Sequence, residues 1–213
     1  MINDTNFSLY LIRHAEAQAN YNYIVSDSPN IKLTKTGVKQ TKFLKSRFAN
    51  KQIYKVYSSP FERAIATAES SFPEHKVNVV EQITEYNAGN WKGQERKLVY
   101  TDEILQKVHN LGKFFKFPNG ESYSQVEHRM ASWLENNIMY SGFVSSESNL
   151  NNVNIVVVSH AIALKCLIRY IMNYDDDFIL NQRLDNTGVT KMTFNSNIGW
   201  KMIYINDNSH LRF

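Results

Sequence analysis

Cysteine is almost absent from this sequence of 213 residues, because Cys166 is the only one. A single cysteine cannot form a disulfide within the chain, and it cannot supply a cysteine-based zinc site. We therefore expect a reducing compartment and a fold held by a hydrophobic core, in which Cys166 is a packing residue. Hydrophobic residues make up 43% of the chain, which is enough for such a core and excludes intrinsic disorder.

Long apolar runs are also missing. The most apolar stretch, residues 161–172, contains Lys165 and Arg169 and is shorter than the roughly 18 uninterrupted residues that cross a membrane. The residues before the apolar run 9–12 carry no positive charge, which argues against a signal peptide. These features predict a cytoplasmic protein that does not act at a membrane.

Acidic residues are absent from residues 28–61, whereas the same stretch contains seven lysines and one arginine. Such a basic run can indicate nucleic-acid binding. The alternative is a helix with lysines on its solvated faces and an apolar stripe made of Val38, Thr41, Leu44 and Phe48. We favour the helix and expect no nucleic-acid partner, because no aromatic platform accompanies the lysines.

Short apolar runs alternate with helical patterns along the chain, which predicts an α/β fold. The expected strands are residues 8–12, 53–57, 77–83 and 153–158, the last of them central because it is β-branched and almost entirely apolar. A helix is expected at about 61–70, with Ser59 as its N-cap and Pro60 at its first position. A hairpin is expected at 188–205. The predicted architecture is a three-layer α/β/α sandwich with a mainly parallel sheet.

The segment from about 91 to 150 interrupts this alternation. It offers a helix near 94–111, a turn, and a second helix near 122–141 that begins with a capping box of Ser122 and Gln125. Residues 141–154 are polar and are expected to form a surface loop. We interpret the chain as one domain, 1–213, with a helical cap insertion at about 91–150.

Two histidines follow predicted strands at equivalent places. His14 comes after residues 9–12 with Arg13 beside it, and His160 comes after residues 154–159. The carboxyl ends of parallel strands share one edge of the sheet, where ligands bind in open α/β folds. Either histidine alone is better explained as a structural residue, but the pair indicates a functional site.

Arg63 and Glu85 are expected at the same edge. Arg63 falls in the first turn of the helix at 61–70, where a guanidinium beside unpaired backbone N–H groups suits a phosphate. Glu85 follows the predicted strand 77–83 and is a candidate general acid or base. An ion pair on a surface helix and an ordinary strand-end glutamate are the respective alternatives.

These residues belong to a series of motifs that resembles the histidine phosphatase superfamily, also called the phosphoglycerate-mutase-like family. The motifs occur in family order over residues 9–190 and comprise Arg13-His14-Ala15-Glu16, Leu33-Thr34 with Gly37, Ser59-Pro60 with Arg63, Glu85 with Gly89, Trp91 and Gly93, Pro118 with Gly120-Glu121-Ser122, Ser159-His160, and Asn186-Thr187-Gly188. Ala15 and Ala161 stand where the family usually has glycine. We expect the two methyl groups to tighten the pocket, with strain wherever φ must be positive.

The resemblance implies a phosphomonoester hydrolase of the phosphatase branch that acts on small phosphorylated metabolites. It implies that His14 forms a phosphohistidine, that Glu85 is the proton donor, and that the phosphate is bound by Arg13, Asn20, Arg63 and His160. It also implies that neither a metal nor another cofactor is needed.

Alternative functions remain open. One is a phosphoglycerate-type phosphomutase, and another is a non-catalytic module that binds phosphorylated ligands. The substrate's leaving group is expected to lie under a roof of aromatic residues that includes some of Tyr86, Trp91, Phe114, Phe115, Phe117 and Tyr123. The chain is expected to be a monomer or a homodimer.

Overall fold

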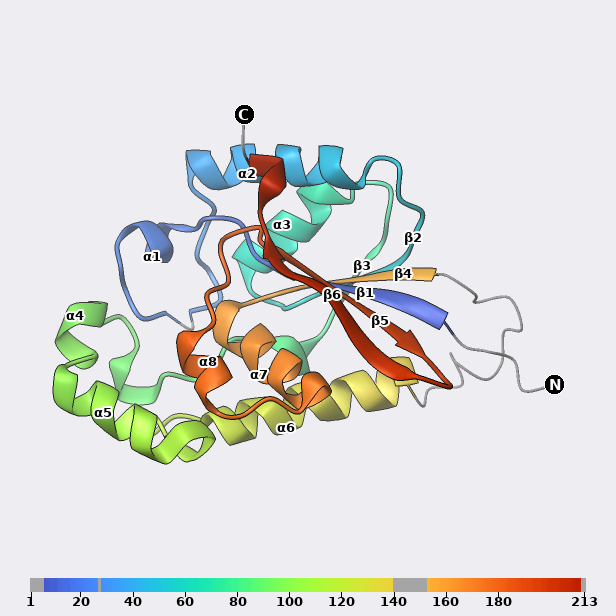
Figure 1. Ribbon diagram of the computed structural model, residues 1–213. Helices are drawn as coiled ribbons and strands as arrows, with labels where there is room; N and C mark the ends of the chain where they lie inside the picture. The colour runs from blue at the N-terminus through green and yellow to red at the C-terminus, as the bar shows by residue number, and fades with distance from the viewer. Residues whose placement is uncertain (1–5, 27, 140–152, 212–213) are drawn as a thin grey trace.

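A six-stranded sheet forms the centre of the computed structural model, which describes residues 6–26, 28–139 and 153–211. The strand order is β3-β2-β4-β1-β5-β6 (Figure 1). Strands β1 to β4 are mutually parallel, and β5 and β6 are antiparallel additions at one edge. The strands are β1 (Asn6–Arg13), β2 (Ile53–Ser58), β3 (Val77–Val79), β4 (Val153–Ser159), β5 (Val189–Asn195) and β6 (Gly199–Asp207).

Strand β4 lies between β1 and β2, as its apolar sequence predicts. Residues 155–158 have no exposed surface, because helices cover both faces of the sheet. Along β1 the side chains alternate, so that Leu9 and Leu11 join one core cluster while Tyr10 and Ile12 join the other. The predicted central strand is confirmed.

Helices α2 (Lys35–Phe48) and α3 (Glu62–Ser71) cover one face of the sheet. Helices α6 (Tyr123–Leu134) and α7 (Ala161–Met172) cover the other (Figure 1). The three-layer architecture with a mainly parallel sheet is therefore confirmed. Cys166 is buried in α7 as a packing residue, and burial raises the pKa of its thiol.

The apolar stripe of α2 differs from the prediction at one position. Thr41, Leu44 and Phe48 are buried, but Val38 is 47% exposed, and Gly37 faces the protein beside it. A Cβ atom at Gly37 would lie 2.1 Å from the carbonyl oxygen of Glu16, so only glycine fits there. The lysines at 35, 39, 42 and 45 are exposed, as expected of a solvated helix face.

The helix expected at about 61–70 is confirmed, because α3 begins at Glu62. Its predicted N-cap is wrong: Phe61 occupies that position, and the Ser59 hydroxyl contacts the ring of His160 instead. The strand expected at 77–83 is too long, because β3 ends at Val79 and a 3₁₀ turn occupies Glu81–Ile83. Glu85 therefore follows a 3₁₀ turn and not the end of a strand.

The cap contains two helices where one was expected at 94–111. Helix α4 (Arg96–Val99) ends at Tyr100, and α5 (Asp102–Leu111) begins anew with the Thr101 side chain as its N-cap. Both lie on the same side of the molecule as α1 (Gln18–Tyr21) (Figure 1). The capping box of α6 is confirmed, and α6 continues as a π-helical segment, Glu135–Met139.

Residues 140–152, which include most of the predicted surface loop, lie outside the described ranges. Helix α8 (Asp177–Asn181) follows α7, which ends at Asn173 in the left-handed conformation. Short 3₁₀ turns occupy Gly89–Trp91, Gly112–Phe114 and Ser209–Leu211. Within the described part of the chain, the helices are too short or too polar to traverse a bilayer.

Candidate active site

His14 lies directly after β1 and is 3% exposed. Its Nδ1 is 2.7 Å from the carbonyl oxygen of Ala15, which can only accept, so Nδ1 carries the proton. The Nε of Arg63 donates to Nε2 of His14 at 3.2 Å. Burial, followed by the charges of Arg63 and Arg13, holds the pKa of His14 well below its usual value. The imidazole is therefore neutral, with its lone pair on Nε2.

His160 occupies the equivalent place after β4, and its ring centroid lies 5.1 Å from that of His14. Its Nε2 is 2.8 Å from the hydroxyl oxygen of Ser59. Its Nδ1 is buried and has no hydrogen-bond partner among the described residues. Burial and the charge of Arg63 lower the pKa of His160 well below its usual value. An incoming acceptor group would satisfy this orphaned nitrogen.

Two arginines flank the histidines, of which Arg63 is buried and Arg13 is half-buried. Arg63 stands in the first turn of α3 and donates from Nη1 to the carbonyl of Ser28 at 2.8 Å. Arg13 donates from Nη1 to the carbonyl of Leu184 at 2.7 Å, whereas its buried Nε is unpartnered in the described structure. Burial lowers the pKa of Arg13 to about 10, so its guanidinium stays charged at neutral pH.

Two asparagines complete the side of the site formed by α1. The Asn20 side-chain oxygen accepts from the backbone N–H of Ala17 at 3.1 Å and from the Asn186 amide at 3.4 Å. Asn186 also donates to the carbonyl of His14 at 2.9 Å, which fixes the backbone beside the ring. Ala15 and Ala161 do not have positive φ, so the expected strain at these positions does not occur.

Glu85 reaches the site through a contact that sequence reasoning missed. Its carboxylate accepts the backbone N–H of Ala163 at 3.0 Å and that of Ile162 at 3.4 Å, so it caps the N-terminus of α7. The N-cap residue of α7, His160, makes no side-chain cap of its own. The sequence did contain one indication of this contact: the helix predicted after residues 154–159 has no capping side chain at its start, so a residue from elsewhere must cap it.

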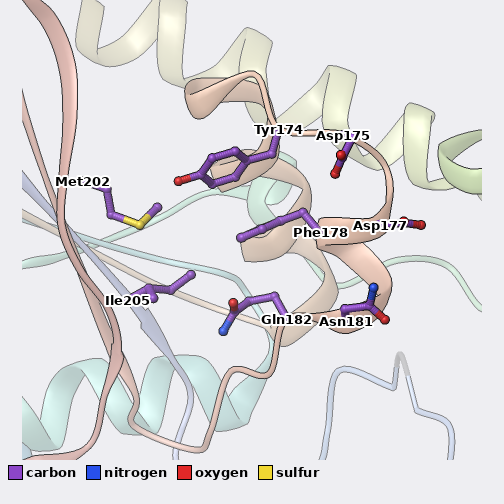
Figure 2. A pocket seen from close by; sticks show the side chains of 8 residues that line it. All are labelled: Tyr174, Asp175, Asp177, Phe178, Asn181, Gln182, Met202 and Ile205. Carbon is purple, nitrogen blue, oxygen red and sulfur yellow. The ribbon is translucent and has the colours of Figure 1, made fainter.

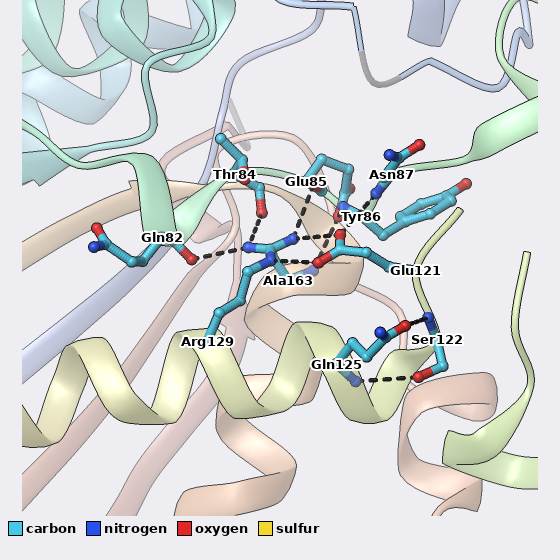
Figure 3. Close-up of polar contacts among 10 residues, drawn as sticks. All are labelled: Gln82, Thr84, Glu85, Tyr86, Asn87, Glu121, Ser122, Gln125, Arg129 and Ala163. Atoms are coloured by element: carbon cyan, nitrogen blue, oxygen red, sulfur yellow. Dashed lines mark hydrogen bonds and ion pairs between the residues drawn. The ribbon is translucent and has the colours of Figure 1, made fainter. Parts of the chain in front are cut away.

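Arg129 of α6 holds the segment that carries Glu85 (Figure 3). Its guanidinium donates to the carbonyls of Gln82, Thr84 and Glu85 at 2.8, 2.8 and 3.0 Å. It also forms an ion pair with Glu121 at 2.8 Å, and Glu121 in turn accepts from the backbone N–H of Asn87. Neither Arg129 nor this network was predicted, although Glu121 belongs to one of the recognised motifs.

A cavity of about 220 Å³ gathers these residues. Five of the six predicted site residues line it, namely Arg13, His14, Asn20, Arg63 and Glu85. His160 is outside the lining set, although its ring is next to that of His14. Further lining residues that were not predicted include Arg96, Tyr100, Ile162, Lys165 and Arg183. We call this cavity the phosphate pocket, in view of its charge.

The expected aromatic roof is only partly present. Tyr86 lines the phosphate pocket and stacks on Phe117, with ring centroids 4.4 Å apart. Trp91, Phe115 and Phe117 pack against one another inside the cap, whereas Phe114 is 68% exposed. The cap aromatics therefore stabilise the cap more than they contact the pocket.

A second hollow lies between α8 and β6 (Figure 2). Tyr174, Phe178, Met202 and Ile205 form its apolar part, and Asp175 and Asp177 stand at its rim. No lysine or arginine is among its eight lining residues. Gln182 borders both this groove and the phosphate pocket, so the loop after α8 separates them.

Comparison with known proteins agrees with this geometry. The family model for the histidine phosphatase superfamily (branch 1) matches residues 9–208. A Hydrogenobacter thermophilus protein named "Putative phosphoserine phosphatase 2" is 27% identical over 209 residues, which cover 96% of this chain and 97% of the relative. A 2,3-bisphosphoglycerate-dependent phosphoglycerate mutase of Thermoplasma acidophilum is 24% identical, with 84% of each chain covered.

Solved structures show the same fold. Phosphoserine phosphatase from Entamoeba histolytica, in complex with 3-phosphoglyceric acid, superimposes with a TM-score of 0.80 at 24% identity, covering 96% of this chain and 99% of that one. The six-stranded, mostly parallel sheet and its helices thus define a phosphoglycerate-mutase-like α/β protein. More specifically, the chain belongs to branch 1 of the histidine phosphatase superfamily. Its family and relatives support a phosphatase or phosphomutase enzyme.

Proposed function

We propose that the protein hydrolyses phosphate monoesters of small metabolites through a phosphohistidine on His14. The observation that carries the proposal is the tautomer of His14. The Nδ1–H group donates to the Ala15 carbonyl, so Nε2 is unprotonated, and it lies 3.2 Å from Nε of Arg63. A neutral imidazole beside a cationic fork is suited to attack a phosphoryl group.

In the first step, Nε2 of His14 forms a bond to phosphorus while the bond from phosphorus to the leaving oxygen breaks. Arg13 and Arg63 stabilise the negative charge on the phosphoryl oxygens, and Nδ1 of His160 and the Asn20 amide donate to the same group. These side chains take the part that a metal ion plays in other phosphatases. Glu85 gives its proton to the leaving oxygen, which departs as an alcohol.

In the second step, Glu85 removes a proton from a water molecule, whose oxygen attacks phosphorus. The bond from phosphorus to Nε2 breaks, and inorganic phosphate leaves with His14 again neutral. Glu85 regains its proton in this step and so serves as acid and then as base. Its capping contact with α7 keeps its carboxylate beside the phosphate pocket through both steps.

Covalent trapping tests this proposal. Brief exposure to p-nitrophenyl phosphate should leave acid-labile phosphate on the wild-type protein and none on His14→Asn. His128→Asn is the matched control, because His128 is exposed on α6 and outside the phosphate pocket. Equal inertness of wild type and His14→Asn would favour a non-catalytic module that binds phosphorylated ligands.

A phosphomutase is the second candidate, because a phosphoglycerate mutase is among the relatives. We favour hydrolysis, since residues 21–30 do not resemble the longer stretch that follows the first motif in mutases. Incubation with 3-phosphoglycerate and a trace of the bisphosphate separates the two. Release of inorganic phosphate supports hydrolysis, and formation of 2-phosphoglycerate without free phosphate contradicts it.

A further inference from the structure

The phosphate pocket continues into a second cavity under the cap. This side chamber has a volume of about 450 Å³ and shares four lining residues with the phosphate pocket, namely Arg96, Tyr100, Ile162 and Lys165. Its remaining lining residues are Leu105, Val108, His109, Tyr123, Ile179, Leu180 and Asn181. A leaving group that extends from the phosphate into the chamber therefore passes these four residues, two of which are cationic.

Lys165 is unusual because it is 9% exposed and forms no ion pair within the described ranges. It stands one helical turn after Ile162 on α7 and donates from Nζ to the carbonyl of Ile179. Burial lowers the pKa of Lys165 to about 8, so most molecules carry the charge at neutral pH. A buried ammonium with one neutral acceptor is short of partners, because it can donate three hydrogen bonds.

Arg96 approaches the same junction from the cap. It opens α4, and in the described structure its guanidinium has neither a hydrogen bond nor an ion pair. The neighbouring Lys97, by contrast, is paired with Glu95 at 2.9 Å and lines neither cavity. An unpaired arginine facing a buried lysine gives the junction a charge that the protein itself does not neutralise.

The phosphate pocket as a whole also has more positive charge than a bound phosphate can neutralise. Five cationic side chains line it, namely Arg13, Arg63, Arg96, Lys165 and Arg183. Asp185 pairs with Arg183, and Glu85 offsets one further charge only when it is ionised, so at least three positive charges remain. A phosphate monoester supplies at most two negative charges, so at least one cation stays uncompensated when only a phosphate is bound.

The walls beyond the junction are largely apolar. Val108, Tyr123 and Ile179 are buried there, and Leu105 and Leu180 continue the surface toward solvent. Such walls favour an aliphatic or aromatic body over a sugar, because burying hydroxyl groups without partners is unfavourable. The groove in Figure 2 offers no comparable site, since its charged residues are two aspartates.

We infer that the side chamber is a specificity site for a leaving group with a second anionic group, which binds between Lys165 and Arg96, and with an apolar body that lies against Val108, Tyr123 and Ile179. This inference rests on the proposed phosphatase function. It deepens that function by naming a substrate class, in which an apolar chain links a phosphate ester to a carboxylate or a second acidic group.

A series of ω-phosphooxyalkanoates of increasing chain length tests the inference against the corresponding primary amides. The acid and the amide differ in charge but hardly in shape or in the basicity of the leaving oxygen. For the chain length that spans the junction, kcat/KM of the acid should exceed that of the amide at least about tenfold, because a charged hydrogen bond contributes roughly 1.5 to 3 kcal/mol. A ratio near one at every length overturns the inference.

Three variants locate the effect. Lys165→Met should reduce the ratio of acid to amide below about two. Arg96→Gln should also reduce the ratio, and it leaves the core intact because Arg96 is exposed. Lys97→Gln is the matched control and should retain the full ratio. Retention of the ratio by both Lys165→Met and Arg96→Gln contradicts the proposed site.

Calorimetric binding of the phosphonate analogues, in which CH₂ replaces the ester oxygen, gives a readout that needs no turnover. The acid analogue should bind wild type at least about tenfold more tightly than the amide analogue, and both should bind Lys165→Met alike. If p-nitrophenyl phosphate is not hydrolysed, the phosphatase proposal fails while these affinities still decide the anion site. If it is hydrolysed and the affinities are equal, only the anion site fails.

Discussion

The hydrogen-bond partners of individual side chains decide which roles are chemically open to them. Nδ1 of His14 donates to a backbone carbonyl, so Nε2, which accepts from Arg63, carries the lone pair that can react. His160 has the reverse arrangement, with Nε2 engaged by Ser59 and Nδ1 unpartnered among the residues described. Two histidines with similar burial therefore present different nitrogens, which suits one to bond formation and the other to hydrogen-bond donation.

Glu85→Gln should affect substrates according to their leaving groups. A glutamine cannot supply a proton, so kcat/KM for ethyl phosphate should fall about 10²- to 10⁴-fold. The decrease in kcat/KM for p-nitrophenyl phosphate should be much smaller, because p-nitrophenolate departs without protonation. We compare kcat/KM because it reports the formation of the phosphohistidine and not its hydrolysis, in which Glu85 acts as a base. An equal loss for both would show that Glu85 is not the acid.

Arg129→Lys should also slow ethyl phosphate hydrolysis more than p-nitrophenyl phosphate hydrolysis, but by a smaller factor than Glu85→Gln does. Lysine cannot hold three carbonyls and a carboxylate at once, so the segment 82–87 loosens and Glu85 loses its position. We expect kcat/KM for ethyl phosphate to fall several times more than kcat/KM for p-nitrophenyl phosphate. A purely structural role would lower both rates equally.

Arg169→Lys is the matched control for Arg129→Lys. Arg169 of α7 is also largely buried and pairs with Glu127 at 2.6 Å and Asp176 at 2.8 Å, but it has no contact with the segment before Glu85. Both substitutions should lower the free energy of unfolding by a similar amount, because each weakens a buried ion pair. Only Arg129→Lys should change the ratio of the two rates.

At the scale of elements, α2 positions the loop that contains His14. The Thr34 side chain accepts from the Gly37 N–H, and the Thr34 N–H donates to the Glu16 carbonyl at 3.0 Å. The Thr34 hydroxyl donates to the Glu16 carboxylate at 2.5 Å. The first turn of α2 thus packs directly on the backbone of Glu16. Glycine is needed at position 37 because a Cβ atom there would overlap the Glu16 carbonyl.

Gly37→Ala should therefore destabilise the protein, although the same change normally stabilises a helix by up to about 1 kcal/mol. The added methyl group would overlap the Glu16 carbonyl and displace the loop, at a cost of about 1 to 3 kcal/mol in the free energy of unfolding. Urea denaturation measures this cost. Lys39→Ala, at an exposed site on the same helix, should change stability by less than about 0.5 kcal/mol.

Local sequence patterns predicted the strands and the edge of the sheet at which the site lies. These features depend only on neighbouring residues, such as the spacing of apolar residues and the residues that follow a strand. The predicted N-cap at Ser59 was wrong because the hydroxyl has a distant partner, His160. The capping of α7 by Glu85 likewise joins residues 78 positions apart. Lys165 reads as a polar interruption of an apolar helix, and only the fold shows that a cavity lies beside it.

At the scale of the whole molecule, the site places cations and ionisable rings inside the core rather than on its surface. Arg13, Arg63, His14 and His160 are all located where the two layers of helices meet the end of the sheet. Desolvation lowers the pKa of both histidines, so the folded state favours their neutral forms. The desolvation that keeps both rings in their neutral form therefore also makes the folded state less stable below the ordinary pKa of histidine.

The free energy of unfolding should decrease as the pH falls below about 6.5. In the unfolded chain His14 and His160 bind protons near pH 6.5, whereas in the folded protein they stay neutral well below that pH. The unfolded state then holds more protons, so each histidine should destabilise the fold by up to about 1.4 kcal/mol per pH unit on further acidification. Urea denaturation at pH 7.5, 6.5 and 5.5 measures the slope.

Asparagine variants assign that slope to particular rings. His14→Asn and His160→Asn replace an ionisable ring with a neutral amide, so each should flatten the dependence between pH 6.5 and 5.5 by about one proton's contribution. His128→Asn is the control variant, because His128 is exposed on α6 and lies outside the phosphate pocket. If the His14 and His160 variants keep the wild-type slope, the buried histidines are not the source of acid sensitivity, and the desolvation that we assign to the site is absent.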